Sequence, residues 1–242
     1  MKTTEEIRSK INRLAKGYVF TYCDFNNEVH SKESIIKALN RMAQSGEIKK
    51  LAKGKFYKPE SSRFGPLEPP HQQIVKDLLE KDSKLIGYLT GFSAYNQLGL
   101  TSQNSHIIEI GRNTPKSSLS RGIFKVKFVL QKNKITQANI YHLQLLDSLK
   151  NLKLIPDTTN QNAVKRIKSL IKDLDKQAKS LLISLSLKYS PATRALLGSM
   201  LEDLNFDGSE LAKLKASLNK VTTYKYYDIE SVVKSASNWG IL

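Results

Sequence analysis

The sequence has little cysteine, no long apolar run and no apolar leader, and each shortage excludes a class of protein. Cys23 is the only cysteine among 242 residues, which excludes an internal disulfide and a cysteine-based zinc site. No apolar run approaches the roughly 20 residues that a membrane-spanning helix needs. The first ten residues, MKTTEEIRSK, carry acids and lack the apolar core of a signal peptide. We therefore expect a cytoplasmic protein in which Cys23 is a small buried hydrophobic residue.

Acidic residues are also scarce. The chain has 39 basic and 22 acidic side chains, a formal net charge of +17. By segment the charge is +6 in residues 1–60 (13 basic, 7 acidic), +6 in 61–150 (12 and 6) and +5 in 151–242 (14 and 9). An evenly basic chain has a nucleic acid as its first expected partner and an anionic membrane surface as its second. Because no concentrated basic amphipathic helix is present, we expect no membrane partner.

Catalytic motifs are nearly absent. The four histidines, His30, His71, His106 and His142, are scattered singly, so no zinc spacing arises. No phosphate-binding loop of the G-x-x-x-x-G-K-[ST] type exists. Asp173 and Asp175 could hold a divalent ion, but Leu174 between them fits the apolar positions of a helix, which favours a solvated, salt-bridged helix face. The sequence therefore predicts no enzyme, no metal and no cofactor.

The most informative stretch runs from Ser31 to Lys58. At about 3.6 residues per turn, its first part has one apolar face, and the opposite face is polar. The polar face consists of Ser34, Lys37, Asn40, Arg41 and Gln44. Such a helix packs through one face and can read DNA bases with the other, with Lys37, Asn40 and Arg41 as the candidates for contacts to base edges.

A basic hairpin is predicted directly after this helix. Gly46 stands where a glycine ends a helix, and two short strand-like runs, 47–51 and 55–58, surround Gly54. Five lysines fall within ten residues that contain no acid: Lys49, Lys50, Lys53, Lys55 and Lys58. Helix, glycine stop and basic hairpin in this order predict a winged helix-turn-helix with phosphate-contacting lysines. The alternative interpretation is an ordinary amphipathic helix with a solvated hairpin.

The remaining pattern predicts two domains. Residues 4–15 read as a first helix, 18–20 as a short strand, and Asp24 as the N-cap of a brief helix. The segment 61–70 holds three prolines and a glycine, so we expect an irregular linker between a winged-helix domain, 1–60, and a second domain, 71–242.

The second domain is predicted to begin with a small sheet and to end with helices. The expected elements are helices over 71–82 and 90–98, strands over 85–89, 107–110 and 123–131, and helices from 136 onward, over 191–204 and over 211–218. Apolar residues repeat between Val164 and Leu185 in a pattern that fits either one long helix or two helices of a compact bundle. The aromatic C-terminal segment is expected to be docked.

A second basic stretch lies between Glu109 and Asp147, where no acid occurs. It supplies seven positive charges: Arg112, Lys116, Arg121, Lys125, Lys127, Lys132 and Lys134. Two interpretations fit this stretch equally well, namely solvent-facing residues on one side of a sheet and a second anion-binding face.

Several segments together resemble a known family. They are TYCDF, SIIKALNRMAQSGEIKKLAKGKFYKP, GYLTGFSAYNQLGLTSQ, HIIEIGRN, KYSPATRALLGSMLEDL, LKASLNKVTTYKY and NWGI. Over most of residues 5–241 the chain resembles the AbiEi antitoxins of bacterial AbiE-type abortive-infection systems, which are type IV toxin-antitoxin systems. The resemblance implies an N-terminal winged helix that represses its own operon and a C-terminal domain that counters a nucleotidyltransferase-like toxin without a stable complex.

The sequence thus predicts an α+β protein with an N-terminal winged helix-turn-helix, followed by a larger mixed domain with a small β-sheet and a C-terminal helical bundle. Its expected function is that of a DNA-binding antitoxin whose partners are operator DNA and, functionally, the toxin. Three alternatives stay open. They are an RNA-binding protein that shields a toxin's target through residues 112–134, a plain transcriptional regulator, and an enzyme acting on the toxin or its product.

Overall fold

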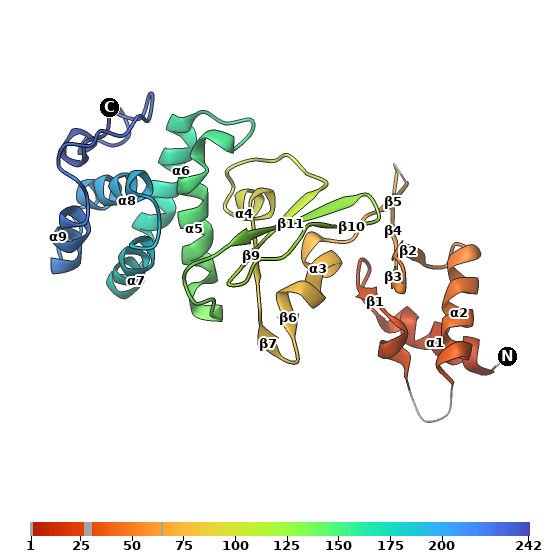
Figure 1. The fold of residues 1–242 in the computed structure, drawn as a ribbon. Coiled ribbons are helices and arrows are strands. Elements are labelled where there is room, and N and C mark those ends of the chain that lie inside the picture. Colours follow the sequence, from red (N-terminus) through yellow and green to blue (C-terminus); the bar gives the residue numbers. More distant parts are fainter. Residues whose placement is uncertain (1, 27–30, 64) are drawn as a thin grey trace. The chain divides into compact units, whose positions relative to one another are not determined.

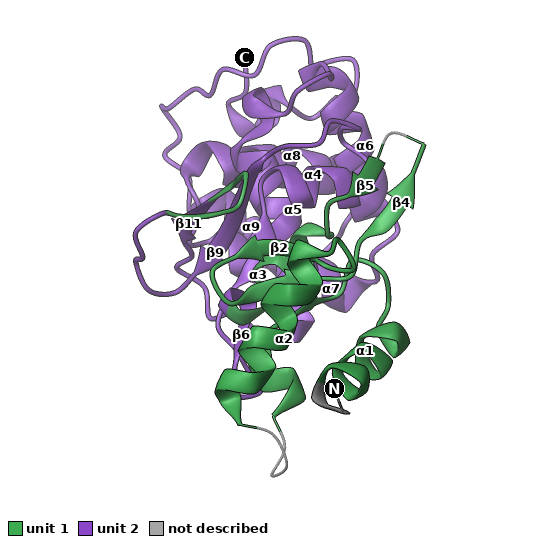
Figure 2. Ribbon diagram, turned by 90° about the vertical axis from the view of Figure 1, so that its right-hand side faces the viewer, with its two compact units in different colours: residues 1–77, 119–125 green, residues 78–118, 126–242 purple. Residues whose placement is uncertain are grey.

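The computed structural model describes residues 2–26, 31–63 and 65–242 and shows a mixed α+β fold. The chain divides into two compact units (Figure 2). Unit 1 comprises residues 1–77 and 119–125, and unit 2 comprises residues 78–118 and 126–242. Each unit is thus built from two separate stretches of the chain.

Unit 1 begins with the elements that the sequence predicts, in the predicted order (Figure 1). They are α1 (Lys2–Arg13), β1 (Val19–Phe20), the 3-10 helix η1 (Tyr22–Phe25), α2 (Lys32–Gln44), β2 (Lys49–Ala52) and β3 (Lys55–Tyr57). The strands form an antiparallel sheet in the order β1-β3-β2. The apolar faces of α1 and α2 form the core together with Phe20, which packs edge-on to Phe25 at 5.4 Å and stacks with Phe56 at 6.4 Å between ring centroids.

Local signals explain where α2 begins and ends. Ser31 is its N-cap, and the Ser31 hydroxyl accepts a hydrogen bond from the backbone N–H of Ser34 at 3.3 Å. Gly46 follows the C-cap with φ of 81°, the left-handed conformation that glycine adopts without a steric penalty. The predicted glycine stop is confirmed.

Two details of η1 differ from the sequence prediction. The N-cap is Thr21, whose hydroxyl accepts from Cys23 N, while Asp24 completes the capping box from the third position of η1. The prediction of Asp24 as the N-cap was therefore wrong by three residues. Cys23 is exposed, because the short turn buries only Phe25, so the prediction of a buried Cys23 was also wrong.

The predicted irregular linker contains a hairpin instead. β4 (Glu60–Ser62) pairs antiparallel with β5 (Gly65–Leu67), and Ser61 lies opposite Pro66. In a two-stranded sheet both strands are edges, so a proline is tolerated. The composition of this segment was therefore misleading.

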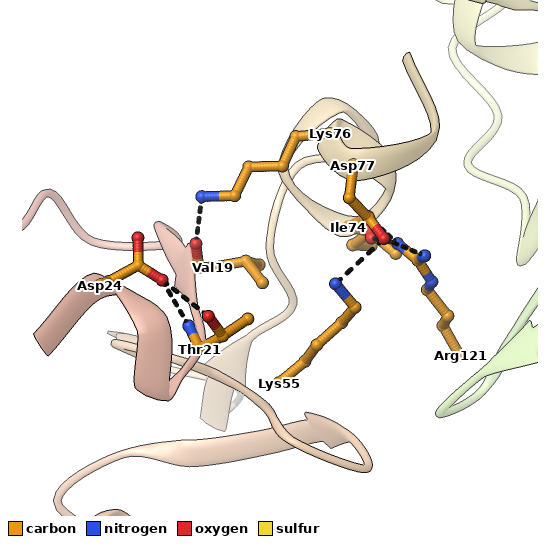
Figure 3. Close-up of polar contacts among 8 residues, drawn as sticks. All are labelled: Val19, Thr21, Asp24, Lys55, Ile74, Lys76, Asp77 and Arg121. Carbon is orange, nitrogen blue, oxygen red and sulfur yellow. Dashed lines mark hydrogen bonds and ion pairs between the residues drawn. The ribbon is translucent and has the colours of Figure 1, made fainter. Parts of the chain in front are cut away.

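Polar contacts explain why unit 1 extends beyond the hairpin to Asp77. Helix α3 (His71–Leu79) follows it, and the Gln73 side-chain oxygen accepts from the N–H of Val19 at 3.2 Å. Lys76 donates to the Val19 carbonyl, as Figure 3 shows, and its ammonium lies 3.9 Å from the Tyr18 ring centroid. The first part of α3 thus packs with β1, so the boundary of the compact unit lies after Asp77 and not at 61–70.

The sheet of the second half has the strand order β10-β11-β9-β8. Its elements are β8 (Tyr88–Thr90), α4 (Phe92–Gln97), β9 (Ile107–Arg112), β10 (Leu119–Arg121) and β11 (Phe124–Leu130), and the small pair β6 (Glu80–Lys81) and β7 (Lys84–Leu85) precedes them. β10 and the first two residues of β11 belong to unit 1. β8 pairs antiparallel with β9, with Tyr88 opposite Gly111 and Thr90 opposite Glu109.

Helices make up the rest of unit 2. They are η2 (Gln137–Asn139), α5 (Ile140–Lys150), η3 (Leu152–Leu154), α6 (Asn160–Lys172), α7 (Lys176–Ser186), α8 (Pro191–Asp203), α9 (Ser209–Ala216) and η4 (Ser237–Trp239). Residues 142–149 of α5 are all buried, because β8, α7 and α8 all pack on this helix. The apolar repeat between Val164 and Leu185 forms two helices, α6 and α7, which confirms the bundle alternative.

The C-terminal segment is docked, as predicted. Trp239 is 3% exposed, and its ring N–H donates to Glu202 at 2.6 Å. Gly198 on α8 makes room for the ring, since a Cβ atom at this position would lie 2.2 Å from Trp239. Within the described ranges, no helix combines the length and apolar character needed to cross a bilayer.

We predict that Gly198→Ala destabilises the protein by roughly 1–3 kcal/mol, because the added methyl overlaps the buried ring of Trp239 and the ring or the helix must shift. Chemical denaturation followed through the emission of Trp239, the sole tryptophan, measures the loss. The matched control is Gly208→Ala, where the nearest atom, at 2.7 Å, is the flexible carboxylate end of Glu210. Equal losses in the two variants would contradict the packing argument.

Candidate functional sites

The polar face of α2 is the first candidate site, and its predicted residues differ in exposure. Lys37, Arg41 and Gln44 are exposed, whereas Ser34 and Asn40 are half-buried. The opposite face of the helix is buried and consists of Ile35, Ala38, Leu39 and Met42. The division into a packed and a polar face is as predicted.

Three of these side chains already have intramolecular partners. Asn40 donates to the Ile36 carbonyl one turn earlier at 3.0 Å, and the Ser34 hydroxyl donates to the Ser31 carbonyl at 2.8 Å. Arg41 donates to the Thr4 hydroxyl on α1. Asn40 and Arg41 would have to exchange these bonds to contact bases, whereas Lys37 and Gln44 project from the exposed face.

The lysines of the β2–β3 hairpin separate into two groups. Lys49, Lys50 and Lys53 are exposed, which suits contact with phosphates. Lys58 donates to the carbonyls of Asn12 and Leu14 at 2.7 and 3.1 Å and so satisfies the C-terminal end of α1. Lys55 is half-buried and lies 3.2 Å from Asp77. Only the first three therefore present their charge to solvent.

In unit 1, the carboxylate of Asp77 contacts two cationic side chains, Arg121 and Lys55 (Figure 3). Its carboxylate accepts two hydrogen bonds from Arg121, at 2.6 and 2.7 Å, in addition to the contact with Lys55. Arg121 is 6% exposed and also donates to the Ile74 carbonyl. Burial alone would raise the pKa of Asp77, but the hydrogen bonds and charges of Arg121 and Lys55 outweigh it, so this pKa lies below its ordinary value.

Arg121 therefore has a structural position, and its charge is not presented to solvent. Of the seven residues of the predicted second basic face, Arg121 and Lys125 belong to unit 1 and the other five to unit 2. Within unit 2, the cationic groups of Arg112 and Lys116 lie 5.6 and 5.4 Å from the ring centroid of Phe128. The sequence did not indicate that these seven residues divide between two units, because the division depends on contacts between residues far apart in the sequence.

A groove of about 540 Å³ in unit 2 is lined by three lysines. It is lined by Asn113, Leu130, Gln131, Lys132, Lys134 and Lys188. Lys188, which follows α7, joins the groove through a hydrogen bond to the Lys132 carbonyl at 3.3 Å. Its distance in the sequence from the 112–134 stretch explains why the sequence pattern missed it.

Gln131, which lines this groove, also belongs to a polar centre around the buried carboxylate of Asp147. Tyr88, Thr90 and Tyr189 donate to it through their hydroxyls at 2.6, 2.7 and 2.8 Å. The Gln131 amide donates to both tyrosine oxygens at 2.9 Å. Burial raises the pKa of Asp147, and the three hydroxyl donors offset only part of this shift. The result is a polar centre in which, among the described residues, no cationic side chain forms a hydrogen bond to Asp147.

The acids considered as a metal site act as helix caps. Asp175 is the N-cap of α7 and accepts from the N–H of Ala178 at 2.7 Å, while Asp173 is the C-cap of α6. Among the described residues, no three or more His, Cys, Asp or Glu side chains gather as a metal site would require. His30 lies outside the described residues.

The architecture defines an α+β protein of two compact units. The chain belongs to the family described as "Family of unknown function (DUF6088)", which matches residues 6–181. The fold is similar to that of the RV2827C protein from Mycobacterium tuberculosis in its crystal structure, with a TM-score of 0.57 and 14% sequence identity over 92% of this chain and 84% of that chain. No curated protein matches the sequence.

We predict that Asp147→Asn removes a pH dependence of folding. Because the pKa of Asp147 is raised in the folded state, the carboxyl contributes most stability at acidic pH. This contribution is lost as the pH rises from the unfolded value, about 4, through the folded pKa. Urea unfolding between pH 4 and 7 should show a shallower decline for the variant than for the unmodified protein. Asp173→Asn, unfolded with urea over the same pH range, is the control, since Asp173 is exposed. An unchanged slope in Asp147→Asn would contradict the assignment.

Proposed function

We propose that residues 1–60 form a winged helix-turn-helix that binds duplex DNA, and that the protein is an antitoxin which represses its own operon. The observation that carries the DNA-binding part is the combination, within unit 1, of an exposed polar helix face with three exposed lysines on the following hairpin. The order of elements and the β1-β3-β2 sheet are compatible with this class of domain.

Charge and geometry divide the roles in this proposal. Lys37, Arg41 and Gln44 would contact bases from α2, and Lys49, Lys50 and Lys53 would contact phosphates from the hairpin. Lys55 and Lys58 are assigned to the fold, because Asp77 and the end of α1 already engage them.

The antitoxin part rests on the resemblance to AbiEi antitoxins. This resemblance implies that the C-terminal domain, residues 71–242, counters a nucleotidyltransferase-like toxin without a stable complex. Unit 2 makes up most of this domain. The unit offers a basic groove for an RNA shared with the toxin, which keeps the RNA-shielding alternative open. Should unit 2 prove dispensable, the protein would be a plain transcriptional regulator.

We predict that the alanine variants of Lys50 and Lys53 weaken binding to any duplex about equally and that each lowers the slope of log affinity against log salt by roughly one unit.

Arg41→Ala should instead cost about 1–3 kcal/mol of binding free energy on the operator and much less on random DNA. Fluorescence anisotropy with both duplexes at several salt concentrations measures these effects.

Lys213→Ala supplies the control for the Lys50 and Lys53 variants, because it removes an exposed lysine of unit 2 that belongs to neither predicted basic stretch. If the slope of log affinity against log salt is unchanged in the Lys50 and Lys53 variants, the β2–β3 hairpin does not contact DNA. If Arg41→Ala loses equal affinity on both duplexes, its role as a base contact would be wrong.

We further predict that the double charge reversal Lys132→Glu and Lys134→Glu abolishes protection from the cognate toxin while leaving operator binding intact. Surface charges of this kind contribute little to folding, so a loss of protection reports function. Co-expression with the toxin and growth measurement test this, and circular dichroism verifies the fold. The matched control reverses Lys213 and Lys220, two exposed lysines outside the groove. Full protection by the groove variant would remove the groove from the mechanism.

A further inference from the structure

A second cavity of unit 2 has no role in the proposed function. Its volume is about 390 Å³, within the range of small-molecule sites. It is lined by Lys150–Leu154, Ala192 and Thr223–Tyr226. These segments come from the end of α5 with η3, from the start of α8 and from the C-terminal segment. The cavity thus forms where three distant parts of the sequence meet.

The lining carries positive charge and no acid. Lys150, Lys153 and Lys225 are three of its ten residues, and all three are exposed. Ala192 is in the first turn of α8, at the positive end of the helix dipole. Three ammonium groups around one cavity favour a ligand with several negative charges.

The same cavity also has apolar and aromatic walls. Tyr224 and Tyr226 are 9% and 7% exposed, and Leu154 is 71% exposed. Nearby, the Lys153 ammonium lies 5.5 Å from the ring centroid of Tyr227. A simple inorganic anion would use the lysines alone, whereas a ligand with a flat organic part would also cover the apolar surface.

One wall contains a polar atom without a partner. The hydroxyl of Tyr224 is buried and makes no hydrogen bond with the described residues. Leaving such a group unpaired costs free energy.

The walls are held in place by backbone hydrogen bonds. Tyr224 N donates to the Gly240 carbonyl at 2.7 Å, Leu242 N to the Tyr224 carbonyl at 2.9 Å, and Tyr226 N to the Leu242 carbonyl at 3.0 Å. In η3, Leu154 N donates to the Asn151 carbonyl at 2.8 Å. A site with fixed walls loses little entropy when a ligand binds.

We propose that this cavity binds a nucleoside polyphosphate, with the phosphates on Lys150, Lys153 and Lys225 and the base against the tyrosine and leucine walls. The ligand could be a free nucleotide or the triphosphorylated 5′ end of an RNA, since both present the same chemistry. This inference is independent of DNA binding by unit 1.

Isothermal titration calorimetry of the full chain with ATP, GTP, inorganic triphosphate and adenosine tests the proposal. Binding of at least one nucleotide is expected, at least 10-fold tighter than triphosphate and adenosine. A short RNA with a 5′ triphosphate, compared with its 5′-hydroxyl form, distinguishes the two sources. If neither nucleotide nor the triphosphorylated RNA binds, or if triphosphate binds as tightly as the nucleotide, the proposal is overturned.

Variants locate the site. The pair Lys153→Gln and Lys225→Gln should weaken nucleotide binding about 10-fold or more, whereas Lys165→Gln with Lys176→Gln removes the same charge outside the cavity and should have little effect. Equal weakening by both lysine pairs would assign binding to general surface charge and overturn the proposal.

Discussion

The arrangement of unit 2 depends on one buried carboxylate. Asp147 on α5 receives hydroxyl hydrogen bonds from two residues of β8 and from Tyr189, which precedes α8. Apolar contacts alone tolerate small shifts of a helix along a sheet, whereas three directed hydrogen bonds to two oxygens do not. Gln131, just after β11, donates to both tyrosines and so connects a further strand to the same centre. An acid at this position is costly to bury, and its value lies in fixing how the sheet and helices of this unit meet.

The sequence predicts well what depends on neighbouring residues. The amphipathic face of α2 and the glycine after it were readable, because each is set by a few consecutive side chains. The repeat between Val164 and Leu185 predicted helix correctly but left one helix and two helices open. The sequence fails where the partner is far away along the chain. Nothing near Arg121 in the sequence indicates that it bonds to Asp77, 44 residues earlier. Nothing near Asp147 indicates that three hydroxyls donate hydrogen bonds to its carboxylate.

Charge counting shows the same limit. Lys55, Lys58, Lys76 and Arg121 contribute to the basic composition, yet each is engaged by a carboxylate or a backbone carbonyl of unit 1. The positive charge that a phosphate backbone could meet is therefore smaller than the formal total. Lys188 shows the opposite case, since packing adds it to a groove that the local sequence assigns to other lysines. A composition suggests the chemical class of a partner, but the fold selects which residues remain for it.

The division of unit 1 into two stretches of chain has a consequence for synthesis. A ribosome releases residues 1–77 well before residues 119–125, so Asp77 emerges without Arg121. Until the later stretch is made, the Leu51 carbonyl also lacks Gly122, the residue against which it packs so closely that a Cβ atom there would lie 2.8 Å away. The N-terminal part of the nascent chain must therefore wait for about fifty further residues, at roughly 5–20 residues per second, before it can complete its structure. A DNA-binding surface on this unit would reach its final form only after residues 78–118, the first part of unit 2, have been translated.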